Sequence, residues 1–287
     1  MYEPESIRLG TSGFTARGWP GAFYPKGLPE REYLSYYATR FNTVELVTTL
    51  YGTPAPSTVR RWYSKTPKDF LFAVKVPQKI THQNILVGCE NEMYQFLNVM
   101  DALGEKLGPL LFKFGYFNPN VFAGVNDFLG RLLPFLAKLP KRYRVAVEIR
   151  NEDWLVPQFY DALRSCGVAH VLSNQAGAIR LAQAFDNCDP ITADFTYVRW
   201  SGDRKTMEQQ TKTWGNVIID RRAELAEWSL LLHKLQERKI KIFAYANNYY
   251  EGCAPATAET FRSLWSPNAQ EARPRISPVE RQANLFG

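Results

Sequence analysis

Eight short runs rich in β-branched and aromatic residues recur along the 287-residue chain, and segments with helical spacing separate them. The predicted strands are residues 6–12, 41–47, 70–76, 108–114, 144–150, 169–174, 195–200 and 240–248. The predicted helices are residues 29–40, 57–65, 91–106, 125–138, 157–165 and 221–238. The crossover at 175–194 carries the weakest signal.

Strict alternation of strand and helix predicts a parallel sheet, and eight repeats at this length favour an α/β fold with a single (β/α)8 TIM barrel. The alternative is a doubly wound open sheet. The sequence contains neither G-x-G-x-x-G after the first strand nor G-x-x-x-x-G-K-[ST], so the usual nucleotide loops of that alternative are missing. From about residue 267 the chain becomes polar and proline-marked. We therefore expect a TIM-barrel domain at 1–266 and a short flexible C-terminal tail at 267–287.

Near their C-terminal ends, several predicted strands carry polar residues at alternate positions, so that these side chains lie on one face of the strand. Barrel strands point alternate residues inward, and active sites form where the strands end. The residues on this face, which have the same parity within each strand, are Thr43 and Glu45, Ala73 and Lys75, Leu111 and Lys113, Ala146, Glu148 and Arg150, Tyr197 and Arg199, and Tyr245 and Asn247. Any one of them could be a core ion pair or an exposed strand end. Burying so many charges without partners would cost several kcal/mol each, so we expect them to line one partly solvated mouth.

Charge narrows the class of partner. The formal net charge is +7, and within the predicted mouth the cations exceed the carboxylates by two. The cations are Lys75, Lys113, Arg150 and Arg199, and the carboxylates are Glu45 and Glu148. An anionic ligand would balance the excess, which favours nucleic acid, a phosphorylated metabolite or a carboxylate.

Cysteine spacing and hydropathy indicate in which cellular compartment the protein is found. The four cysteines are far apart with no paired spacing, which indicates neither a disulfide scaffold nor a Cys-based zinc site. No apolar run approaches the roughly 18 residues of a membrane span, and the first residues show no signal core. We expect a cytoplasmic protein with no membrane partner.

Seven stretches of sequence resemble one family. They are GTSGF (10–14), FYPKGLP (23–29), YYATRFNTVEL (36–46), FAVKVPQKITH (72–82), LGPLLFKF (107–114), VAVEIRNEDW (145–154) and NNYYEGCAP (247–255). In this order they resemble the Domain of Unknown Function 72 family, also called YecE-like, across nearly the whole barrel. The resemblance implies a TIM barrel but no settled activity. It marks Gly10, Thr11, Ser12, Glu45, Lys75, His82, Glu148, Arg150, Asn247, Asn248 and Glu251.

The chain departs from the family pattern at four positions. Phe14, Lys113 and Asn151 stand where the family usually has Trp, Gln and His, and Asn174 replaces a common Asp near the sixth strand end. If the missing His and Asp move protons or bind metal in relatives, this chain binds the same ligand with altered or absent catalysis.

Metal chemistry is restricted by the histidines, of which the chain has three. His233 falls in an amphipathic helix and His170 opens a strand, which leaves His82 near the mouth. A multi-zinc site needs several His and carboxylate ligands, so we expect none here. Mg²⁺ or Mn²⁺ shared by Glu45 and Glu148 remains open.

Three functions stay open. The first is an enzyme or binding protein for nucleic acid, including single-stranded or damaged DNA, with hydrolase, phosphodiesterase-like or lyase chemistry. The second is a metal-free enzyme on a small phosphorylated or carboxylated metabolite, in which Glu148 moves a proton and a lysine stabilises the oxyanion. The third is a non-catalytic adaptor. The candidate catalytic residues are Glu45, Lys75, His82 and Glu148; the candidate ligand-binding residues are Ser12, Lys113, Arg150, Asn174, Arg199, Asn247, Asn248, Tyr249 and Glu251.

Aromatic residues near the strand ends bear on the first function. Trp214, Tyr249 and Tyr250 could stack on bases or could cap the barrel.

The tail carries a second candidate interaction. Gln282, Leu285 and Phe286 match a Q-x-x-L-F pattern that resembles the peptide by which bacterial DNA polymerases and repair proteins dock on the replication sliding clamp. Alternatively, Leu285 and Phe286 fold back into a groove on the barrel. Prolines in the tail disfavour a continuing helix, and docking needs an extended segment. We expect residues 281–287 to bind a clamp with micromolar affinity, which would place the barrel near DNA.

Overall fold

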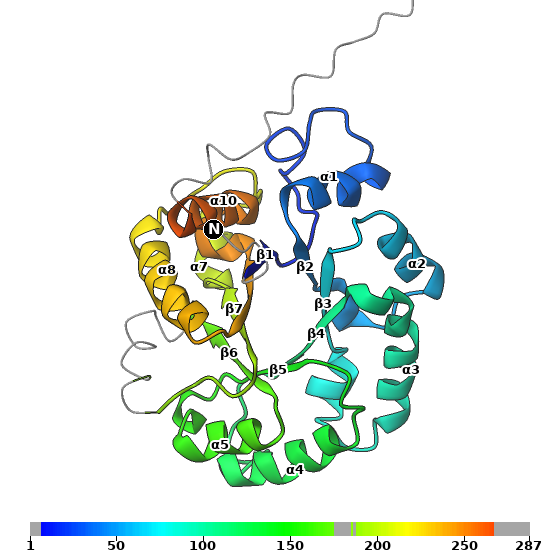
Figure 1. Ribbon diagram of the computed structural model, residues 1–287, viewed down its shortest axis with the longest axis vertical. Coiled ribbons are helices and arrows are strands. Elements are labelled where there is room, and N and C mark those ends of the chain that lie inside the picture. The colour runs from blue at the N-terminus through cyan, green and yellow to red at the C-terminus, as the bar shows by residue number, and fades with distance from the viewer. Residues whose placement is uncertain (1–6, 175–184, 186–187, 267–287) are drawn as a thin grey trace, which may run out of the picture.

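In a computed structural model that describes residues 7–174, 185 and 188–266, eight parallel strands form a barrel enclosed by helices (Figure 1). The strands are β1 (Ile7–Thr11), β2 (Thr43–Leu46), β3 (Leu71–Lys75), β4 (Leu107–Lys113), β5 (Val145–Glu148), β6 (Ala169–Ser173), β7 (Phe195–Trp200) and β8 (Lys241–Ala246). Their order around the sheet is β1-β8-β7-β6-β5-β4-β3-β2. The (β/α)8 prediction and all eight predicted strands are confirmed.

Most of the helices cover the outer face of the sheet. The helices are α1 (Tyr33–Arg40), α2 (Pro56–Ser64), α3 (Glu90–Met100), α4 (Val125–Ala137), α5 (Pro157–Ser165), α7 (Arg204–Gln210), α8 (Arg222–Glu237), α9 (Asn248–Glu251) and α10 (Ala254–Trp265). The short α7 and α9 lie instead beside the C-terminal mouth of the barrel. Proline stands in the first turn of α2, α5 and α10, where its missing N–H costs nothing. Among the described residues, no helix is long and apolar enough to cross a membrane.

The six predicted helices are found, with two corrections. The segment 29–40 begins with a 3-10 helix, Glu30–Glu32, and α1 starts only at Tyr33. Residues 91–106 are not one helix: α3 ends at Met100 and a 3-10 helix, Asp101–Lys106, follows. Gly104 interrupts the helical backbone with φ 50° and ψ −127°. Helices α7, α9 and α10 were not predicted. Most of the crossover 175–194 and the whole tail 267–287 lie outside the described residues, so the flexible tail stays a prediction.

The parity prediction is confirmed inside the barrel. The inward-facing apolar residues pack together as Ala73, Leu111, Ala146, Ala169, Val171, Phe195, Tyr197, Phe243 and Tyr245. Residues of the opposite parity, such as Val44, Phe72 and Val147, join the separate core between sheet and helices. The interior apolar layer closes the barrel from below, so polar groups placed later on the strands can meet only at the C-terminal mouth.

The seam between β1 and β2 relies on side chains and a glycine. The Tyr37 hydroxyl accepts from the Thr11 N–H (2.8 Å) and donates to the Thr43 carbonyl (3.1 Å). Above it, the Gly13 N–H donates to the Glu45 carbonyl (2.8 Å). A Cβ on Gly10 would lie 2.0 Å from the Thr43 carbonyl oxygen, so this close approach requires glycine. The seam thereby brings the loop after β1 against the end of β2.

Candidate anion-binding site at the barrel mouth

A cavity of about 680 Å³ opens at the C-terminal ends of the strands. Strand register builds its floor: Lys113 lies opposite Glu148 on adjacent strands, and Arg199 lies opposite Tyr245. Nine of the candidate site residues line the cavity, namely Ser12, Lys75, Lys113, Arg150, Asn174, Arg199, Asn247, Asn248 and Tyr249. These nine residues come from the ends of seven strands, all but β2, and therefore meet in one place, as parity predicts.

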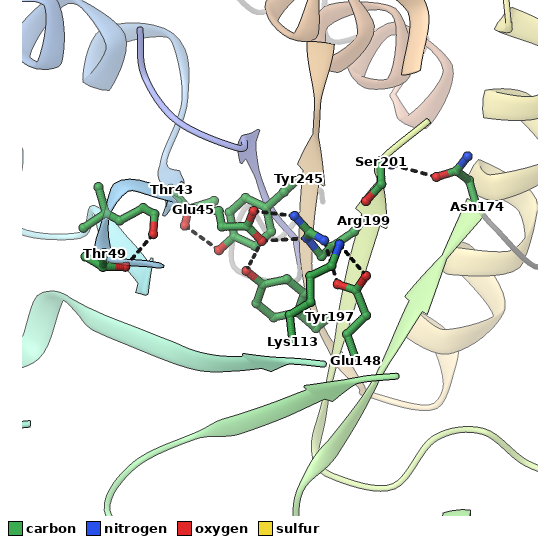
Figure 2. A network of polar contacts seen from close by, with 11 residues as sticks. Thr43, Glu45, Thr49, Lys113, Glu148, Asn174, Tyr197, Arg199, Ser201 and Tyr245 are labelled. Atoms are coloured by element: carbon green, nitrogen blue, oxygen red, sulfur yellow. Dashed lines mark hydrogen bonds and ion pairs between the residues drawn. The ribbon is translucent and has the colours of Figure 1, made fainter. Parts of the chain in front are cut away.

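Arg199 lies between two buried carboxylates in the floor of the site (Figure 2). Its Nε and Nη2 donate to Glu45 Oε2 and Oε1 at 2.8 and 2.9 Å, and its Nη1 donates to Glu148 Oε2 at 2.6 Å. The remaining contacts complete the network: the Tyr197 hydroxyl donates to Glu45 Oε2 (2.7 Å), and Lys113 Nζ lies 2.9 Å from Glu148 Oε1. Bidentate Arg–carboxylate contact of this kind is strong and fixes geometry, so the floor is rigid.

The floor carboxylates stay ionised at neutral pH. Burial by itself would raise the pKa of both, but the Arg199 guanidinium and the hydrogen bonds more than offset this effect. The pKa of Glu148 falls to about 2, and the pKa of Glu45 is also lowered. Such carboxylates are weak bases. The geometry thus gives Glu45 and Glu148 the task of holding Arg199 and Lys113.

The donor set does not fit a divalent cation shared by Glu45 and Glu148. The guanidinium of Arg199 already occupies the position between the two carboxylates, and Lys113 takes the remaining Glu148 oxygen. Elsewhere in the described part of the chain, no three His, Cys, Asp or Glu side chains come together to hold a metal ion.

Lys75 differs from the other floor residues. It ends β3, is 8% exposed and lines the cavity. Within the described residues its amine makes neither an ion pair nor a hydrogen bond, whereas its backbone carbonyl accepts from Thr49 Oγ1 at 2.6 Å. Burial, and then the positive charges of Arg199 and Lys113, lower the pKa of Lys75 to about 8.

The cations at the rim fall into two classes. Arg204 pairs with Glu208 (2.8 Å), and Arg221 pairs with Glu224 (3.0 Å). Arg150, which follows β5 and is exposed, has no acidic partner among the described residues. Lys75 and Arg150 are therefore the lining cations whose charge no described carboxylate neutralises.

The asparagines of the mouth shape its loops. Asn174 Oδ1 accepts from the N–H groups of Ser201 and Gly202 at 2.7 and 3.2 Å, which holds the loop after β7. Asn247 caps α9 by accepting from the Tyr249 N–H (3.0 Å). Asn248 Oδ1 accepts from Trp19 Nε1 (3.2 Å) and from a backbone N–H at the start of α10 (2.9 Å). These contacts are positioning contacts, so the amides support the wall.

Four candidate site residues do not line the cavity: Glu45 and Glu148, which lie buried beneath it, and His82 and Glu251. His82 lies in a short π-helix (Lys79–Gln83) after β3, is exposed, and contacts Thr81 Oγ1 through Nδ1 at 2.7 Å. Partial burial and the nearby Lys75, Lys113 and Arg150 lower its pKa. Glu251 is buried and accepts from the Arg221 N–H at 2.8 Å, so it holds the segment before α8.

The departure at Asn151 has a structural explanation. Asn151 is buried, and its amide exchanges two hydrogen bonds of 2.9 Å with the backbone N–H and carbonyl of Phe117. It clamps the loop after β4. At Lys113, by contrast, the departure adds a cation to the floor of the site.

Sequence reasoning missed the loop SGDR that follows β7. Ser201, Gly202, Asp203 and Arg204 all line the cavity. A Cβ at Gly202 would lie 1.9 Å from the Tyr249 carbonyl oxygen, and its φ is +62°, so the loop requires glycine to lie against α9. The available signal was its position immediately after a barrel strand.

Comparison with known proteins agrees with this architecture. The family model described as a protein of unknown function, DUF72, matches residues 8–282. The UPF0759 protein YunF of Bacillus subtilis is 26% identical over 263 residues, covering 84% of this chain and 89% of YunF. The UPF0759 protein YecE of Escherichia coli K12 is 37% identical over 127 residues, a match that spans 44% of this chain and 43% of YecE.

Solved structures show the same fold. A DUF72 family protein from Thermotoga maritima has a TM-score of 0.68 and 24% identity, with 92% of this chain and 99% of that chain covered. Another from Enterococcus faecalis has a TM-score of 0.66 and 20% identity, covering 90% and 95%. Because the family model matches nearly the whole described barrel, the chain belongs to the DUF72 family.

Proposed function

We propose that the barrel mouth binds a small organic anion, a phosphorylated or carboxylated metabolite, and that Lys75 and Arg150 hold its anionic group. The observation that carries the proposal is the environment of the Lys75 side chain. It is buried, it lines the cavity, and it has no acidic partner in the part of the chain that the structure describes.

The charges of the site support this proposal. Glu45 and Glu148 are matched by Arg199 and Lys113 through direct contacts. Lys75 is left over, and a buried ammonium group without a counter-charge is costly. Phosphate or carboxylate would remove that cost by accepting charge-assisted hydrogen bonds from Lys75 and from Arg150 at the rim.

The size of the cavity favours a small molecule. Ligand pockets commonly occupy roughly 300–1,000 Å³, and the mouth lies within this range at about 680 Å³. The aromatic residues proposed to stack on bases are engaged in packing. Tyr250 is fully buried, and Tyr249 packs edge-on against Trp214 (5.1 Å between ring centroids) while its hydroxyl donates to Glu208 (3.2 Å). Binding of nucleic acid therefore stays a prediction with less support from the geometry.

Titration calorimetry with inorganic phosphate, and then with phosphorylated and carboxylated metabolites, tests the proposal. Lys75→Met removes the charge and keeps the length of the side chain. Lys241→Met is the matched control, because Lys241 begins β8 at the opposite end of the barrel and is exposed. A lost hydrogen bond to a charged group costs about 1.5–3 kcal/mol, so Lys75→Met should weaken binding about 10- to 100-fold. Equal affinity in the two variants, or no anion binding by the wild type, would contradict the proposal.

A further inference from the structure

We propose that Lys75 is a covalent catalytic residue whose amine forms a Schiff base with the carbonyl carbon of a substrate that also carries a phosphate or carboxylate. The inference rests on the proposed function, which supplies the anion site, and it adds the reacting group and the class of substrate. The substrate is thus an aldehyde or ketone with an anionic group.

Two other described lysines, the buried Lys106 and the half-buried Lys113, show how a lysine with a structural role is held in this fold. Lys106 is 3% exposed, and its Nζ donates to the carbonyls of Tyr63 and Thr66 at 2.6 and 2.7 Å. Lys113 has Glu148 at 2.9 Å. Lys75 has no such acceptor among the described residues, and it lines the cavity. Its amine has no direct contact with a described carboxylate or carbonyl oxygen. The charges of Glu45 and Glu148 favour the protonated form, but they are outweighed by burial, Arg199 and Lys113.

The surroundings of Lys75 favour the neutral amine, which is the form that attacks a carbonyl. Burial and two neighbouring cations, Arg199 and Lys113, lower its pKa to about 8. Roughly a tenth of the amine is then neutral at pH 7, against about 0.03% for a lysine with the ordinary pKa. The gain in reactive amine is on the order of 300-fold. Desolvation beside a cationic group is a known way to activate a lysine nucleophile.

The backbone under Lys75 is held on both sides. Val76 N–H donates to the Leu111 carbonyl (2.9 Å), and the Lys75 carbonyl accepts from Thr49 Oγ1 (2.6 Å). The side chain therefore leaves a fixed strand end, whereas Arg150 lies at the rim. A simple anion such as phosphate would contact both cations. In a substrate that also has a carbonyl group, the anionic group would stay with Arg150 and the carbonyl would take its place beside the Lys75 amine, which lowers the entropic cost of the reaction.

The step balances without any other reactant. The Nζ lone pair attacks the carbonyl carbon, a C–N bond forms, and the carbonyl π pair moves to oxygen, which receives a proton as nitrogen loses one. The carbinolamine then loses its hydroxyl group as water, with one further proton taken up from solvent. The product is a protonated imine, and the net reaction joins amine, carbonyl and proton to give iminium and water. No oxidant or reductant takes part.

Reductive trapping tests the inference. The full chain is incubated at pH 7 with pyridoxal 5′-phosphate or with pyridoxal, the same aldehyde without phosphate, and each imine is reduced with cyanoborohydride. Peptide mapping by mass spectrometry then gives the labelling rate at every lysine. Lys75→Arg keeps the charge and cannot form an imine, and Lys241→Arg is the matched control. Circular dichroism verifies that both variants fold.

We expect Lys75 to be labelled by pyridoxal 5′-phosphate at least 10-fold faster than Lys241, with protection by inorganic phosphate. Pyridoxal should label Lys75 more slowly, because it lacks the group that Arg150 holds. Labelling spread evenly over exposed lysines, or unchanged total labelling in Lys75→Arg, would overturn the inference. If phosphate binds with the expected loss in Lys75→Met but Lys75 is not trapped, the anion site stands and the covalent role fails.

Discussion

Replacing Arg199 with methionine should destabilise the barrel by several kcal/mol at neutral pH. The substitution keeps much of the apolar length of the side chain but removes three hydrogen bonds, two to Glu45 and one to Glu148. Glu45 is fully buried and would keep the Tyr197 hydroxyl as a hydrogen-bond donor but no cationic partner in contact among the described residues. Removing one partner of a buried ion pair typically costs about 3–5 kcal/mol, because the other charge is left uncompensated.

The loss should depend on pH in a defined direction. In the wild type the folded pKa values of Glu45 and Glu148 lie below the ordinary value of 4.5, so their stabilising contribution is present above that pH. It is lost as pH falls toward about 2, the folded pKa of Glu148. Without Arg199 we expect burial to raise both pKa values, and protonation then relieves the penalty. The difference in unfolding free energy between wild type and Arg199→Met should therefore be largest near pH 7 and smaller near pH 4.

Urea denaturation followed by tryptophan fluorescence measures this difference. Arg142→Met is the matched control, because Arg142 pairs with Asp101 at 2.9 Å on the surface and exposed pairs contribute little to stability. Adding Glu45→Gln to Arg199→Met should recover part of the loss by removing the orphaned charge. A loss below about 1 kcal/mol at pH 7, or one that does not change with pH, would refute the view that Arg199 neutralises two buried carboxylates.

Three further predictions concern the seam, the tail and the anion site. Tyr37→Phe removes the hydroxyl that bridges β1 and β2, and leaving two buried backbone groups without it should lower the unfolding free energy by about 1–3 kcal/mol in urea denaturation. A peptide of residues 276–287 should bind the sliding clamp of the source organism in calorimetry, and a Leu285→Ala, Phe286→Ala version should not; equal binding by both, or by neither, would remove the docking hypothesis. Phosphate affinity should fall as pH rises through about 8, where Lys75 loses its proton, and should stay level there in Lys75→Arg; a level wild-type profile would show that Lys75 does not hold the anion.

The location of the site could be predicted from sequence because strand parity is a local property. A residue two positions from Glu45 or Lys113 on its own strand must point the same way, and parallel strands end at the same edge. Lys113 and Glu148 are then neighbours in the register of β4 and β5, and strand order is the one piece of long-range information needed to expect this.

The roles within the site could not be predicted, because they depend on which charges meet across the barrel. Counting charges suggested that Glu45 or Glu148 could act as a base or hold a metal. The structure places the Arg199 guanidinium between them, and this contact, with Lys113 beside Glu148 and the Tyr197 hydroxyl beside Glu45, makes them weak bases. A count of charges likewise gives Lys75 and Lys113 the same role. They differ because Lys113 has a carboxylate, that of Glu148, at 2.9 Å, and Lys75 has no such contact among the described residues.

Helix α10 shows a signal that was present but missed. Pro255 stands in its first turn, and Ala258, Phe261 and Trp265 are buried at helical spacing. The segment directly follows the motif at 247–255, which was interpreted for its polar residues alone. The structure shows that a helix begins there and covers β1 beside α8 (Figure 1).

The most direct test of the central claim is a crystal structure of the protein grown or soaked in phosphate. We expect an anion within hydrogen-bond distance of Lys75 Nζ and of the Arg150 guanidinium, above an intact contact between Arg199 and Glu45. Phosphate bound elsewhere with the mouth holding only water, or Lys75 turned away from the cavity into an ion pair, would contradict the claim.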